Sequence, residues 1–102
     1  MPEPRVVVVT GASAGVGRAT VRAYAERGWA VGLLARGTDG LQAAAEEVEV
    51  AGGHAVAVPT DVADADQVEA AAVLVEERLG PIEVWVNNAM TSVFALFTDI
   101  RD

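Results

Sequence analysis

A glycine-rich segment over residues 10–17 is the part of the chain whose composition points most directly to chemistry. It reads Thr-Gly-Ala-Ser-Ala-Gly-Val-Gly and follows four consecutive valines at 6–9. A turn between a strand and a helix needs one or two glycines, whereas three indicate that something approaches the backbone closely. A strand leading through such a loop into a helix aims backbone N–H groups and the positive end of the helix dipole at one point. The segment therefore predicts a pyrophosphate site.

The spacing of these glycines separates several classes of nucleotide-binding loop. It is not the Gly-x-x-x-x-Gly-Lys-Ser/Thr of phosphate-loop NTPases, which the chain's lack of lysine also excludes. It differs as well from the common dinucleotide fingerprint Gly-x-Gly-x-x-Gly. Methyltransferases of similar topology commonly have an acidic residue leading into their glycine loop, where this chain has Thr10. The segment instead has the form Thr-Gly-x-x-x-Gly-x-Gly.

The elements that would position this loop alternate between strand and helix. Uninterrupted apolar runs predict strands at 6–9, 30–35, 55–58 and 82–86. Apolar residues at helical spacing predict helices at 16–27 and 65–79, and one between them that ends at 51 and is capped by Thr38 or Asp39. In the first helix the expected buried positions are Val16, Ala19 or Thr20, and Ala23. Asp64, followed three residues later by Gln67, predicts the capped start of the last helix.

This order of elements predicts an α/β fold with a Rossmann-type, doubly wound parallel sheet of four strands and three helices. If the chain reverses direction across the sheet after the third strand, right-handed crossovers give the strand order 3-2-1-4, with the first two helices on one face and the third on the other. Ligands of such sheets bind at the carboxyl ends of the strands, where the strand order reverses. The glycine segment lies at that point.

With its spacing established, the glycine segment resembles the cofactor loop of the short-chain dehydrogenase/reductase family. Two further motifs are similar. Asp61-Val62 follows the third strand, where the family places an Asp and an apolar residue against adenine, and Asn87-Asn88-Ala89 resembles the family's Asn-Asn-Ala-Gly, with Met90 in place of the glycine. The resemblance covers about residues 5–100 and implies hydride transfer between NADP and a carbonyl or alcohol substrate.

The resemblance also implies a set of cofactor-binding residues: Thr10, Gly11, Ser13, Gly15, Val16, Gly17, Arg36, Asp61, Val62, Asn88 and Ala89. The acidic residue that holds the adenosine ribose in NAD-binding members would fall near position 35, where the chain has Ala35 followed by Arg36. A guanidinium suits a 2′-phosphate. NADP is therefore expected in preference to NAD, with Thr38 as a second candidate ligand of the phosphate.

The catalytic residues of the family are a tyrosine, a lysine four positions later, a serine and an asparagine. This chain has a single tyrosine, Tyr24, with Gly28 four positions later, and no lysine. Tyr24 is expected to be a packing residue, so no catalytic residue is assigned. We expect residues 1–102 to form a single partial NAD(P)-binding Rossmann domain that lacks the C-terminal catalytic half and is inactive alone. The alternative is a non-catalytic nucleotide-binding or regulatory module acting with a partner chain.

Composition narrows the partners further. The chain has 102 residues and a formal net charge of −8, which repels nucleic acid and anionic membranes. Neither a membrane span nor a signal peptide is recognisable in it. The absence of cysteine fits a reducing compartment and excludes a thiolate metal site. We therefore expect a cytoplasmic protein without a metal, and leave a homo-oligomer of a full-length form open.

Overall fold

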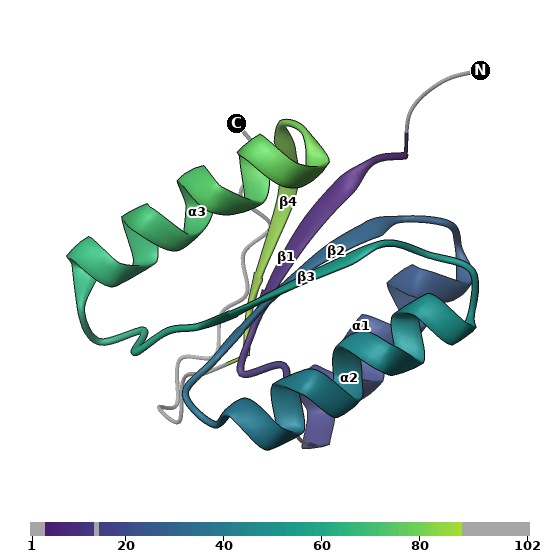
Figure 1. Ribbon diagram of the computed structural model, residues 1–102, viewed down its shortest axis with the longest axis horizontal. Coiled ribbons are helices and arrows are strands. Elements are labelled where there is room, and N and C mark those ends of the chain that lie inside the picture. The colour runs from purple at the N-terminus through teal and green to yellow at the C-terminus, as the bar shows by residue number, and fades with distance from the viewer. Residues whose placement is uncertain (1–3, 14, 89–102) are drawn as a thin grey trace.

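The computed structural model describes residues 4–13 and 15–88 (Figure 1). The strands are β1 (Val6–Thr10), β2 (Ala30–Ala35), β3 (Ala55–Pro59) and β4 (Ile82–Asn87). The helices are α1 (Gly15–Glu26), α2 (Thr38–Val50) and α3 (Ala65–Leu79). Neighbouring strands are parallel, in the order β3-β2-β1-β4. Helices α1 and α2 cover one face of the sheet and α3 covers the other (Figure 1), so the predicted fold class is confirmed.

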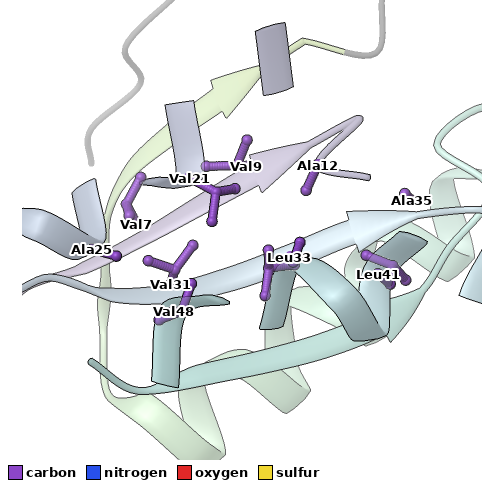
Figure 2. Close-up of a cluster of buried hydrophobic side chains, with 11 residues drawn as sticks. Val7, Val9, Ala12, Val21, Ala25, Val31, Leu33, Ala35, Leu41 and Val48 are labelled. Carbon is purple, nitrogen blue, oxygen red and sulfur yellow. The ribbon is translucent and has the colours of Figure 1, made fainter. Parts of the chain in front are cut away.

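The two central strands are buried on both faces, because every residue of β1 and β2 is shielded by a helical layer. Successive side chains of a strand point to opposite faces. Val7 and Val9 therefore pack towards α1 and α2, while Val6 and Val8 pack towards α3. Figure 2 shows side chains of β1, β2, α1 and α2 pointing into the first of these clusters. The continuous run of valines in β1 thus contributes side chains to both hydrophobic clusters.

The face that α1 turns towards the sheet differs from the prediction. Its buried residues are Gly17, Val21 and Ala25, whereas Val16 is 72% exposed and Ala23 also faces solvent. The predicted stripe was wrong because it gave weight to the apolar side chain of Val16 and none to glycine. The close approach of Gly17 to the loop after β1 determines which side of the helix is buried.

The starts of α2 and α3 are built differently. Gly37 is the N-cap of α2 in an extended conformation, and no side chain of the described residues caps this helix. The prediction that Thr38 or Asp39 caps it was therefore wrong, since Thr38 is already the first helical residue. Asp64 caps α3 as predicted, because its Oδ1 accepts from the backbone N–H groups of Asp66 (3.0 Å) and Gln67 (3.3 Å).

The strands also end later than the apolar runs suggest. β1, β3 and β4 each continue one residue beyond their predicted ends, which brings Thr10, Pro59 and Asn87 into the sheet. These additions all lie at the carboxyl ends of the strands. Within the described residues, no helix combines the length and apolar character needed to cross a bilayer.

Candidate functional site

Four segments predicted to bind a ligand meet at the carboxyl edge of the sheet, defined here as the ends of the four strands and the residues that follow them. Thr10, the last residue of β1, lies beside Leu34 of β2 and Asn87 of β4. Ala35, the last residue of β2, lies beside Pro59 of β3. The residues that follow these strands are consequently neighbours, although they come from distant parts of the sequence.

The glycine loop depends on backbone conformations and spacing that other residues do not allow. Gly11 and Gly15 have φ values of 64° and 60°, in the left-handed region that favours glycine. Gly17 is required for space instead. A Cβ on Gly17 would lie 1.9 Å from the carbonyl oxygen of Gly11 and 2.7 Å from its carbon. The loop therefore folds directly against the first turn of α1, where no acidic side chain opposes an anion.

A buried hydroxyl joins the ends of β1 and β4. Thr10 is only 2% exposed, and its Oγ1 donates to Asn87 Oδ1 at 2.8 Å. The same oxygen accepts from the backbone N–H of Asn88 at 3.0 Å. In the part of the chain that the structure describes, Asn88 Nδ2 is buried and has no hydrogen-bond acceptor. Because burying an unpaired donor is costly, this amide is suited to a ligand oxygen.

A cleft of about 420 Å³ opens between the glycine loop and the segments that follow β2 and β3. Five of the predicted binding residues line it, namely Gly11, Ser13, Arg36, Asp61 and Val62. Gly37, Thr60 and Ala63 contribute to the same walls. Thus one cavity joins a loop rich in backbone donors to an exposed guanidinium and a carboxylate.

The wall formed by Asp61 is held by the start of α3. Gln67 Oε1 accepts from the Asp61 backbone N–H at 2.9 Å, and Gln67 Nε2 donates to Asp64 Oδ2 at 3.3 Å. Asp61 Oδ1 in turn accepts from the backbone N–H of Ala63 at 3.0 Å. The sequence indicated Gln67 as part of a helix cap but gave no sign that it also fixes the loop lining the cleft.

Arg36 is exposed, and among residues 4–13 and 15–88 it has no ion pair or side-chain hydrogen bond. Two other arginines are differently placed. Arg18 Nη2 lies 2.8 Å from Glu47 Oε2, and Arg22 Nε lies 3.7 Å from Glu47 Oε1. The hydrogen bond from Arg18 is the main reason that the pKa of Glu47 is lowered. Arg36 lines the cleft, and within the described residues its guanidinium is not paired with a carboxylate. It is therefore available to bind an anion there.

A wider groove of about 570 Å³ surrounds the Arg18–Glu47 pair between α1 and α2. None of the predicted binding residues lines it, and it does not reach the ends of the strands. Its walls carry charged side chains, of which Arg18 and Arg22 pair with Glu47. The smaller cleft at the carboxyl edge is for this reason the better candidate site.

The remaining predicted residues have separate placements. Val16 lies on the exposed face of α1 and does not line the cleft, and Ala89 falls outside the described residues. Tyr24 packs edge-on against Trp29, with ring centroids 5.0 Å apart, as expected of a packing residue. Within the described ranges, no group of His, Cys, Asp or Glu side chains is arranged to hold a metal ion.

Comparison with known proteins assigns a family to this arrangement. A sequence model described as short chain dehydrogenase matches residues 5–102. The chain belongs to the short chain dehydrogenase family. Among curated relatives of this family, the L-rhamnose 1-dehydrogenase (NAD(P)(+)) of Azotobacter vinelandii is 40% identical over 100 residues. That match covers 94% of this chain and 39% of the relative.

Solved structures of the family superpose well on the described fold. L-Sorbose reductase from Gluconobacter frateurii, complexed with NADPH and L-sorbose, matches with a TM-score of 0.81 at 32% identity, covering 92% of this chain and 38% of that one. An alcohol dehydrogenase from the archaeon Thermococcus sibiricus, complexed with 5-hydroxy-NADP, gives a TM-score of 0.78 at 40% identity, over 82% and 36% of the two chains. This chain thus spans well under half the length of these relatives.

Proposed function

We propose that residues 1–102 form the cofactor-binding part of an NADP-dependent oxidoreductase of the short-chain dehydrogenase/reductase type. The observation that carries the proposal is the convergence at one edge of the sheet of the glycine loop, the Asn88 amide and the Arg36 guanidinium, the last two without a partner among the described residues. Each group offers donors or positive charge in a chain of net charge −8. Those are the properties needed to hold an anionic dinucleotide locally.

Different residues would bind different parts of the dinucleotide. Backbone N–H groups of residues 11–17, with the first turn of α1, would hold the pyrophosphate. Asp61 and Val62 would contact the adenine, and Arg36 would bind the 2′-phosphate. Asn88 Nδ2, together with Ala89, would donate to the ribose on the nicotinamide side. Bound NADPH supplies the hydride for reduction of a carbonyl group.

The proposal assigns binding and orientation, rather than proton transfer, to the described residues. Reduction of a carbonyl also needs a proton for the developing alkoxide, which a tyrosine beside a cation can supply. The only tyrosine, Tyr24, packs on Trp29 away from the cleft.

A carbonyl or alcohol substrate is proposed by analogy with the relatives named above. The proposal further places the protein in the cytoplasm, from its lack of cysteine.

Titration of the chain with NADPH and with NADH by isothermal titration calorimetry tests this function. We expect both to bind, NADPH more tightly. In Arg36→Asp, loss of a charge-assisted hydrogen bond should weaken NADPH binding about tenfold to a hundredfold and leave NADH within about twofold. Arg27→Asp is the matched control, because Arg27 is exposed and directly follows α1, at the end of the helix away from the loop.

These titrations distinguish a wrong function from a wrong assignment of the 2′-phosphate to Arg36. Failure of the chain to bind either dinucleotide would contradict the proposed function. Binding with an unchanged preference for NADPH in Arg36→Asp would contradict only the assignment of the 2′-phosphate to Arg36.

A further inference from the structure

Gly40, in the first turn of α2, lies directly against the glycine loop. A Cβ on Gly40 would be 2.8 Å from Ser13 Cβ, 3.1 Å from Ser13 O and 3.6 Å from Ser13 Cα. Its φ is not positive, so any residue could adopt its backbone conformation. The requirement for glycine at this position is therefore one of space alone.

The contact between Gly40 and Ser13 brings together two walls of the cleft. Ser13 lines the cleft on the side of the glycine loop, while Arg36 and Gly37 line it on the side of α2. Gly37 is the residue from which α2 begins, and only two residues separate it from Gly40. The distance between the loop and the Arg36 segment is consequently set by how closely the first turn of α2 approaches Ser13.

The remainder of α2 cannot shift to make room for a larger residue at position 40. Leu41 and Ala44 are buried in the core beneath α1 and α2, with exposures of 1% and 0%. Close-packed interiors resist displacement, so a Cβ at 40 would be accommodated at the first turn or in the loop. In the part of the chain that the structure describes, no side-chain cap hydrogen bond holds that first turn in place. The segment at 36–37 would move with it.

We propose that Gly40 is a positioning residue that sets the selectivity for NADP over NAD, by holding the Arg36 segment against Ser13. The inference rests on the proposed function. NADP and NAD differ only in the 2′-phosphate, which is assigned to Arg36, whereas the pyrophosphate is assigned to the loop. Displacement of the first turn of α2 therefore weakens binding of NADP and spares that of NAD.

Gly40→Ala tests this inference by calorimetric titration with NADPH and NADH. Misplacement of the guanidinium should weaken NADPH binding about fivefold to tenfold, with NADH binding changed less than about twofold. Alanine has the higher helix propensity, so a loss cannot come from weaker helix formation. Gln42→Ala, at an exposed position of the same helix, is the matched control and should leave both affinities unchanged.

A second pair of variants tests whether the effect passes through Ser13. Ser13→Gly removes the atom at 2.8 Å and leaves the carbonyl oxygen at 3.1 Å, so adding Gly40→Ala to that background should change the NADPH to NADH affinity ratio by less than it does in the parent chain. Independent, additive changes in the ratio would overturn the inference. This comparison also replaces the first if Gly40→Ala alone does not fold.

An unchanged affinity ratio in Gly40→Ala, with both dinucleotides still bound by the parent chain, would overturn the inference and leave the proposed function intact. If the parent chain bound neither dinucleotide, the proposed function would be wrong, and this inference with it. A general loss of affinity for both dinucleotides would show a structural role and would also overturn the assignment of selectivity.

Discussion

The two edges of the sheet are held together in different ways. At the carboxyl edge, the contacts are a buried hydroxyl on Thr10 and glycines that touch backbone atoms. At the amino edge, the side chain of Arg5, which is 67% exposed, lies 3.1 Å from Glu83 Oε1 and has its guanidinium carbon 4.9 Å from the centroid of the Trp29 ring. The Thr10 hydroxyl is thus shielded from water, although its partner Asn87 is itself exposed, whereas the contacts of Arg5 are open to water.

This difference in solvation implies a difference in sensitivity to substitution. Water can replace the partners of an exposed ion pair, so the loss of one partner costs little free energy. A buried polar group whose partner is removed retains its desolvation penalty. Changes at the carboxyl edge should therefore lower both stability and nucleotide affinity, while changes at the amino edge should have small effects on stability alone.

Gly17→Ala is expected to have the largest effect. The added carbon would lie 1.9 Å from the carbonyl oxygen of Gly11, so the loop and α1 must separate. We expect a loss of about 1–3 kcal/mol in the free energy of unfolding from overpacking. Misplacement of the loop should weaken dinucleotide binding by about a hundredfold.

Urea denaturation and calorimetric titration measure the two effects of Gly17→Ala. Ala19→Ser is the control, because it adds one heavy atom at an exposed position of the same helix and should change the unfolding free energy by less than about 0.5 kcal/mol. Similar stability and affinity in the two variants would contradict the close contact between Gly17 and Gly11.

Thr10→Val tests the buried hydroxyl. Valine has nearly the shape of threonine, but Asn87 Oδ1 and the Asn88 N–H would both lose this partner. We expect the free energy of unfolding in urea to fall by about 1–3 kcal/mol. Thr10→Ser keeps the hydroxyl and should cost less than Thr10→Val. A valine variant as stable as the parent would show that the hydroxyl does not stabilise this edge.

The features that sequence predicted correctly are those encoded locally. Residues 6–9 and 30–35 are uninterrupted apolar runs, and such runs indicate strands buried on both faces. The strand order 3-2-1-4 followed from right-handed crossovers and a reversal of direction after the third strand, and it is observed. The cap at Asp64 was also predicted, because the capping carboxylate and the backbone N–H groups that donate to it are separated by only two and three positions.

The features that sequence missed depend on contacts between distant residues. Thr10 was expected in the loop, but its hydrogen bond to Asn87 spans 77 positions and leaves no local pattern. The contact of Gly40 with Ser13 likewise joins two elements. The buried face of α1 was mispredicted because Gly17 has no side chain to count in a hydrophobic pattern. The roles assigned to the individual binding residues remain predictions.

Arg5→Gln, at the amino edge, should have the smallest effect. It removes the ion pair with Glu83 and the cation over the Trp29 ring, yet both contacts are exposed to solvent. We expect a loss of about 0.5 kcal/mol, and at most about 1 kcal/mol, which shrinks as salt is added and the ion pair is screened. Dinucleotide affinity should not change, because Arg5 lies at the other edge of the sheet.

Arg27→Gln is the control for removing an exposed charge that has no ion pair in the described residues. If Arg5→Gln destabilised the protein more than Thr10→Val, burial would not be what makes the carboxyl edge sensitive.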